Sequence, residues 1–191
     1  MQNAFYLKEP ISFLDKNVLL VLLSQKQLKE GVEFSMNSIL SKKDMNLILI
    51  SLTTPGTELL KKANSAFAQN LGIIDSFSED ESNSSQIQYC SPGDFTGIQI
   101  ASEKFEQKLT GQKTILIDAL NVLSVYNKKN ALGKFLHLFS NKTRLRGDSA
   151  IVFCVKESSD PEVVEMMKEF ADKIFDYSDI FVSAVKLAEE R

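Results

Sequence analysis

The sequence predicts an α/β fold with a mostly parallel central sheet. Short apolar runs of strand length alternate with segments whose apolar residues recur at helical spacing, which is the pattern of successive βαβ units. The runs are apolar on both faces, as in strands that helices cover on both sides. In chain order they are VLLVLL (18–23), NLILISL (46–52), LGIIDSF (71–77), TILIDAL (114–120) and AIVFCV (150–155).

Four segments carry the start signals and the apolar faces of helices. Ser24 and Gln27 have the spacing of a capping box ahead of the first helix. Pro55-Gly56-Thr57 leads into the second helix, the turn SPGDFTG into the third, and Asp160-Pro161 into the fourth as N-cap and first-turn proline. The apolar faces are, in order, Leu28, Val32, Met36, Ile39 and Leu40; Leu59, Leu60, Ala63, Ala66 and Phe67; Ile98, Ala101, Phe105 and Leu109; and Val163, Val164, Met167 and Phe170.

Length and composition favour one domain. The chain has 191 residues, 43% of them hydrophobic, which suits a single core better than two. We therefore expect one domain over 1–191, with an N-terminal extension at 1–16 and a helical tail at 179–191. Residues 78–85, SEDESNSS, are polar and acidic without a period and are expected to form an exposed loop.

The charge and the cysteines exclude several classes of protein. The formal net charge is −3, so the molecule as a whole has no basic excess for coating nucleic acid, and any basic surface must be local. Cys90 and Cys154 lie in or beside apolar runs, where a cysteine is usually a small buried hydrophobe. No signal-type segment opens the chain, and its apolar runs are too short to cross a bilayer. We expect a soluble, cytoplasmic protein without membrane insertion.

The templates for common catalytic sites are missing. A P-loop needs glycines after the first strand, then a lysine and a hydroxyl, but here the strand runs directly into SQKQLKE and the first glycine is Gly31. The Gly133-Lys134 pair follows no predicted strand. His137 is the sole histidine, which argues against a zinc cluster and against a serine triad. The sequence therefore predicts no catalytic residue and no metal site.

Asp118 is the candidate for a residual binding site. It ends an apolar run, at the point where many nucleotide-hydrolysing α/β proteins place the aspartate that helps to hold magnesium. One interpretation is a remnant nucleotide site in which Ser24 and Lys26, at a helix N-terminus, attract an anion. The other is a carboxylate bonded to neighbouring backbone or hydroxyls. We favour the second, so no cofactor is expected, and ATP with magnesium is the alternative.

A basic stretch follows Asp118, because no acidic residue occurs between Ala119 and Gly147. A solvated helix face is the favoured interpretation. The alternatives are docking of an acidic protein partner and, less favoured because exposed aromatics are not interleaved, contact with nucleic acid. The loop SPGDFTGI at 91–98 is likewise either a structural corner or a partner contact. The basic residues are Lys128, Lys129, Lys134, Lys142, Arg144 and Arg146.

Several segments, taken together, resemble the archaeal KaiC/GvpD-like branch of the RecA superfamily, in particular degenerate members without a P-loop. NLILISL with Thr53 and Thr54 resembles the second strand of that family, and CSPGDFTGI (90–98) is similar to one of its loops. TILIDALNVLSVY (114–126) resembles its Walker B strand and the next helix, and FADKIFDYS (170–178) its closing strand. The likeness covers roughly 17–178 and implies a RecA-like three-layer α/β/α sandwich.

The departures from that family concern its chemistry. Active members carry a pair of glutamates after the second strand, whereas this chain has Thr53 and Thr54. The resemblance therefore implies a non-catalytic pseudo-ATPase with a regulatory or scaffolding role. Because RecA-like domains commonly assemble side by side, it also implies self-association or a protein partner. Two rivals stay open: a weak nucleotide-binding sensor or ATPase with an atypical site, and a nucleic-acid-binding module that uses 128–146.

Overall fold

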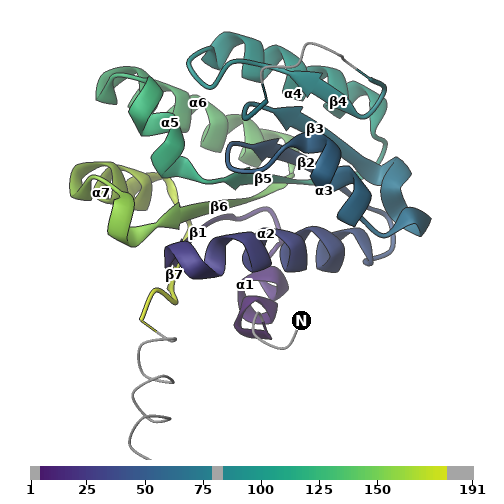
Figure 1. Cartoon of the computed structure of the whole chain (residues 1–191), viewed down its shortest axis with the longest axis horizontal. Coiled ribbons are helices and arrows are strands. Elements are labelled where there is room, and N and C mark those ends of the chain that lie inside the picture. The colour runs from purple at the N-terminus through teal and green to yellow at the C-terminus, as the bar shows by residue number, and fades with distance from the viewer. Residues whose placement is uncertain (1–4, 79–83, 180–191) are drawn as a thin grey trace, which may run out of the picture.

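The computed structural model describes residues 5–78 and 84–179, and within them a parallel sheet lies between two layers of helices (Figure 1). The seven strands follow the order β4-β3-β2-β5-β6-β1-β7, and every neighbouring pair is parallel. The predicted three-layer α/β fold is confirmed. The strands are β1 Val18–Leu23, β2 Met45–Ser51, β3 Leu71–Asp75, β4 Ile87–Tyr89, β5 Gln112–Asp118, β6 Ser149–Val155 and β7 Lys173–Asp176.

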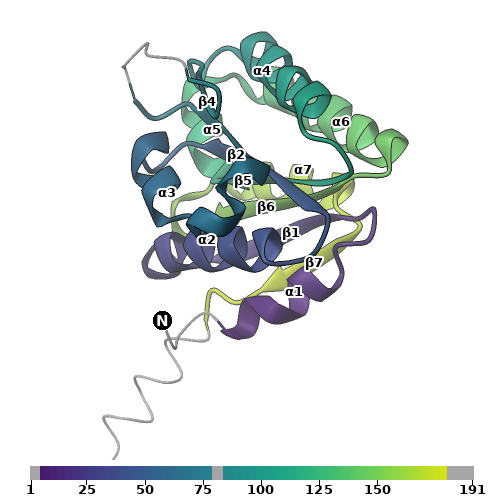
Figure 2. The same ribbon diagram turned by 90° about the vertical axis from the view of Figure 1, so that its right-hand side faces the viewer.

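Helices α1 to α3 cover one face of the sheet and α4 to α7 cover the other (Figure 2). Successive side chains of a strand point to opposite faces, so the central strands supply two separate cores. In β1, for example, Leu19 and Val21 join the core under α2, while Leu20 and Leu22 join the core under α6 and α7. The helices are α1 Lys8–Ser12, α2 Gln25–Leu40, α3 Gly56–Lys62, α4 Phe95–Lys108, α5 Leu120–Tyr126, α6 Lys129–Arg146 and α7 Pro161–Phe170, with 3-10 turns η1 Phe5–Leu7, η2 Ser65–Asn70 and η3 Lys156–Ser158.

The second predicted helix is broken in two, which corrects the expectation of one continuous helix. Helix α3 ends at Lys62, Ala63 has an extended backbone, and η2 begins after Asn64. The Asn64 side chain accepts a hydrogen bond from the Ala66 amide at 3.1 Å, so it caps a new turn instead of continuing the old one. Phe67 still packs against the same core.

The predicted N-terminal extension is part of the fold in its described residues. Leu7, Ile11 and Leu14 are buried in the core under α2. The Tyr177 hydroxyl donates to Glu9 Oε2 at 2.9 Å, which joins α1 to the end of the last strand. The predicted tail lies outside the described residues apart from Asp179, and so do residues 79–83 of the predicted loop. No helix of the described ranges is long and apolar enough to span a bilayer.

Candidate functional site

The candidate nucleotide-site residues lie at the carboxyl edge of the sheet, where open α/β sheets place their ligands. Ser24 and Lys26 follow β1, Thr53 and Thr54 follow β2, and Asp118 ends β5. Strand β6 lies between β5 and β1, so Asp118 and Ser24 belong to strands that are not neighbours.

The connection from β1 to α2 consists of Ser24 alone, because the strand ends at Leu23 and the helix begins at Gln25. The Ser24 amide donates to Gln27 Oε1 at 2.7 Å, and Gln27 Nε2 donates to the Tyr177 carbonyl at 3.0 Å. The glutamine half of the predicted capping box is thus formed. The Ser24 hydroxyl is buried and has no hydrogen-bond partner among the described residues. A one-residue connection whose amide is already bonded cannot wrap a phosphate.

A cleft of about 230 Å³ lies between the start of α2 and the loop from β2 to α3. Lys26 is exposed on the first turn of α2 and does not line it. Lys29 does line it, but its Nζ lies 3.5 Å from Glu58 Oε1 on the opposite wall. The carboxylate of Glu58 therefore balances the positive charge that Lys29 brings to the cleft. The lining residues are Gln25, Leu28, Lys29, Thr53, Thr54, Pro55 and Glu58.

Asp118 belongs to a buried polar row that crosses three strands. Its register partner on β2 is Ser51, and the partner of Ser51 on β3 is Asp75. All three side chains are fully buried. Asp118 Oδ1 accepts hydrogen bonds from the Leu52 amide at 2.7 Å and the Thr53 amide at 3.2 Å. Asp118 Oδ2 has no partner among the described residues and no access to solvent.

Asp75 holds the far end of the same loop. Its Oδ2 accepts from the Gly56 amide at 2.7 Å, where α3 begins, and its Oδ1 accepts from the Phe77 amide at 3.0 Å. Between the two aspartates, Ser51 Oγ donates to the Thr54 carbonyl at 2.5 Å. We call Asp75, Ser51 and Asp118 the loop clamp, because together they fix the backbone from Leu52 to Gly56.

The electrostatics of Asp118 fit a clamp better than a metal ligand. Burial raises the pKa of Asp118 to about 7, and the hydrogen bonds from Leu52 and Thr53 offset only part of that rise. The resemblance to the RecA superfamily implies a magnesium nucleotide at this edge, but the oxygens of Asp118 do not fit one: one carboxylate oxygen is taken by two amides and the other is sealed from solvent. The described residues also contain no cluster of three or more His, Cys, Asp or Glu suited to a metal ion.

Known proteins resemble this chain in structure only. No protein-family model and no curated protein matches the sequence. The uncharacterised protein PH0321 of Pyrococcus horikoshii, solved with an unknown peptide, matches with a TM-score of 0.67 at 11% identity, over 90% of this chain and 81% of that one. The KaiC-like protein PH0186 of the same organism matches with a TM-score of 0.63 at 10% identity, over 85% of this chain and 73% of that one.

A prototypical ATPase from the type III secretion system of pathogenic bacteria matches with a TM-score of 0.57 at 10% identity, over 92% of this chain and 53% of that one. The chain has the fold of RecA-like ATPases. At such low identity the similarity concerns the fold alone, so the chemistry must be judged from the residues at the carboxyl edge.

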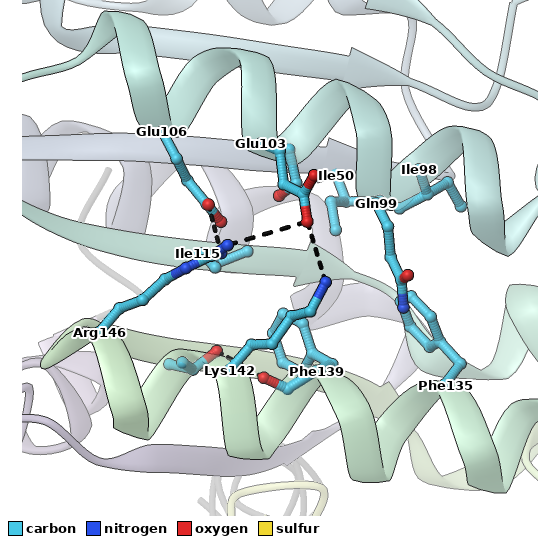
Figure 3. Close-up of a pocket in the computed structure, with 12 residues that line it drawn as sticks. Ile50, Ile98, Gln99, Glu103, Glu106, Ile115, Phe135, Phe139, Lys142 and Arg146 are labelled. Atoms are coloured by element: carbon cyan, nitrogen blue, oxygen red, sulfur yellow. Dashed lines mark hydrogen bonds and ion pairs between the residues drawn. The ribbon is translucent and has the colours of Figure 1, made fainter.

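The basic residues after Asp118 do not form one continuous cationic face. Lys142 pairs with Glu103 at 2.9 Å and Arg146 pairs with Glu106, so both tie α6 to α4 across a small apolar pocket (Figure 3). Within the described ranges, Lys128 and Lys134 have no ion pair. Further pairs join Arg146 to Glu103 at 3.8 Å and Arg144 to Asp172 at 3.0 Å, and Lys129 to both Asp160 at 2.7 Å and Glu162 at 2.5 Å. These cations mainly hold α6 to its neighbours.

Sequence reasoning missed Asp75 as a site residue, although a signal was present. The runs LGIID and TILID both end in Ile-Asp, and both aspartates end buried parallel strands. Only the order of the strands shows that β2 lies between them, so that the two carboxylates hold one loop from both sides.

We predict that Asp118→Asn removes a pH dependence of stability. Because the pKa is raised from 3.8 to about 7 in the folded state, the folded protein keeps a proton that the unfolded chain loses between these values. The stabilisation is complete below pH 4 and is lost as the pH rises through 7. Asparagine stays neutral and keeps an acceptor for both amides. Chemical denaturation from pH 4 to 8 should show similar stability at pH 4 and a more stable variant at pH 8, by on the order of 1–4 kcal/mol. If the free energies of unfolding of the two proteins changed in parallel between pH 4 and 8, the prediction would be contradicted.

Proposed function

We propose that this chain is a RecA-like pseudo-ATPase, which neither binds nor hydrolyses ATP and serves as a regulatory or scaffolding module through contacts with protein. The observation that carries the proposal is the direct passage of β1 into α2 through Ser24. Phosphoryl transfer depends on backbone donors, a lysine and a metal that converge on the phosphates. The β1–α2 connection offers no such donors.

The other groups at this edge support the same conclusion. Thr53 and Thr54 cannot act as a base near neutral pH. Glu58 is the one carboxylate among the described lining residues of the cleft, and its pKa is lowered by a hydrogen bond from Lys62 and by the charge of Lys29. A carboxylate held in two ion pairs is a poor proton acceptor for an attacking water.

An exposed apolar surface at the carboxyl edge is the proposed contact surface. Val125 and Tyr126, at the end of α5, are 80% and 61% exposed, and Phe77, just after β3, is 51% exposed. The loop around Pro92 connects them: Asn127 Nδ2 donates to the Pro92 carbonyl at 2.9 Å, and the Cys90 amide donates to the Asp75 carbonyl at 3.1 Å. We call Phe77, Pro92, Val125 and Tyr126 the edge surface.

The proposed occupant of the edge surface is a second copy of this chain. Grouped exposed apolar residues are typical of protein interfaces, and the resemblance to domains that assemble side by side favours self-association. PH0321, which shares the fold, was solved with an unknown peptide, so one structural neighbour does bind polypeptide. In this proposal the loop SPGDFTGI is both a structural corner and a partner contact. Its structural role is the cap of α4, in which Asp94 Oδ1 accepts a hydrogen bond from the Gly97 amide at 2.9 Å.

The absence of nucleotide binding is tested by isothermal titration with magnesium-ATP. We expect flat heats for the native chain and for Asp118→Ala alike, because Asp118 is bonded to the loop and not turned to solvent. Saturable heats that disappear in Asp118→Ala would contradict the proposal and favour a residual nucleotide site.

Self-association is tested by light scattering on the purified chain. We expect a mass above that of the monomer, and loss of this association in the double variant Val125→Asp, Tyr126→Ser, because a buried unpaired charge opposes the contact. Leu145→Asp is the matched control, since Leu145 is 87% exposed and does not belong to the edge surface. A strictly monomeric native chain would contradict the proposed self-association.

A further inference from the structure

A hollow of about 780 Å³ lies at the amino edge of the sheet, at the other end of β5 from Asp118. It is bordered by the last turns of α4 and α6 and by residues at the starts of β5 and β6. Its volume falls within the range of sites that bind small molecules. We call it the amino-edge hollow, and its charged lining residues are Lys16, Glu103, Glu106, Lys113, Arg146 and Asp148.

Two carboxylates of this hollow are largely removed from water. Asp148 is 5% exposed, and the side chain of Glu106 is 10% exposed. Burial raises the pKa of both groups, and the charge of Asp148 raises the pKa of Glu106 further. Arg146 pairs with Glu106, and the Lys113 amide donates to Asp148 Oδ1 at 3.2 Å, but these contacts offset only part of the rise. A further cationic group beside the two carboxylates would therefore be stabilised.

Two lysines of the same hollow carry charges that are not held in ion pairs. Within the described residues, neither Lys16 nor Lys113 has a carboxylate within 4.0 Å, and Lys113 Nζ donates to the Gly111 carbonyl at 2.9 Å. The Lys16 side chain extends over Gly147, since its Cε lies 3.7 Å from the point where a Gly147 side chain would begin. The hollow therefore offers an anionic group two ammonium donors, separate from the carboxylates that favour a cation.

An apolar slot adjoins the hollow (Figure 3). It is the small pocket between α4 and α6, and Glu103, Glu106 and Arg146 line both spaces. Ile115 and Phe139 are among the apolar residues that line the slot. Its volume of about 30 Å³ is space for about two water-sized groups. The slot therefore suits a short aliphatic group and is too small for an aromatic ring.

We propose that the amino-edge hollow binds a small aliphatic α-amino acid. The ammonium group of the ligand lies beside Glu106 and Asp148, its carboxylate is bound by Lys16 and Lys113, and its side chain enters the apolar slot. A ligand with a single charge would leave either the carboxylates or the lysines without a partner, whereas an α-amino acid carries both charges and an apolar group on one carbon atom. The site lies at the opposite edge of the sheet from the loop clamp and does not depend on the proposed function.

Isothermal titration of the native chain tests the proposal with L-valine and two analogues of similar shape. The analogue 3-methylbutanoate lacks the ammonium group, and isobutylamine lacks the carboxylate. We expect saturable heats for L-valine and binding about ten-fold weaker or more for each analogue, because each loses one set of charge-assisted hydrogen bonds. L-phenylalanine should bind more weakly than L-valine, because its ring is too large for the slot. Flat heats for L-valine, or equal affinity for any of the other three compounds, would overturn the proposal.

Two substitutions locate the site. Asp148→Asn removes a charge and keeps an acceptor for the Lys113 amide, and Lys113→Met removes the ammonium group and keeps an apolar stem. Each should weaken L-valine binding about ten-fold. The matched controls, Glu169→Gln on α7 and Lys134→Met on α6, change exposed residues outside the hollow and should leave binding unchanged. The melting temperature of each variant without ligand checks that it is folded. L-valine binding that neither Asp148→Asn nor Lys113→Met weakens would overturn the proposal.

Discussion

The hydrogen bonds that Asp118 accepts from the loop after β2 are the interaction on which the rest of this edge depends. A buried carboxylate is costly unless donors or a cation compensate it. In this chain the amides of Leu52 and Thr53 supply part of that compensation for Asp118, and the Gly56 amide at the other end of the loop donates to Asp75. The aspartate at the position that the RecA resemblance assigns to metal binding is thus bonded to the protein itself.

The loop clamp also positions the surfaces around it. The loop it fixes forms one wall of the cleft beside α2, and Asp75 additionally accepts from the Phe77 amide at the base of the edge surface. The backbone carbonyl of Asp75 also accepts a hydrogen bond from the amide of Cys90, which leads into the SPGDF loop. A backbone held in this way has little freedom to lose on binding, which favours the proposed protein contacts at the neighbouring edge surface.

Features that depend on residues close together in the sequence could be predicted, and features that depend on distant contacts could not. The five long apolar strands and the cap at Asp160 are local features, and they were predicted correctly. Strand β4 has only three residues and gives no usable period. The break after α3 depends on one side-chain cap at Asn64, which competes with continued helix.

The site itself depended on contacts between distant segments. Asp118 was found because it ends a strand, but its partners are 66 and 65 residues away along the chain. The ion pairs of the basic stretch could not be predicted from the sequence, because their acidic members, among them Glu103, Glu106 and Asp172, lie on other elements. The burial of Leu7 and Ile11 likewise depends on the tertiary position of α1, which the sequence period does not reveal.

Amide hydrogen exchange of the loop tests the central account most directly. The Leu52 and Thr53 amides should be protected in the native chain, and Asp118→Ala should expose Thr53 most, because the Leu52 amide also bonds to the Asp118 backbone carbonyl at 2.8 Å. Magnesium-ATP should leave the native pattern unchanged. If magnesium-ATP altered the exchange of these amides, or if Asp118→Ala left the protection of Thr53 intact, Asp118 would not be the clamp described here.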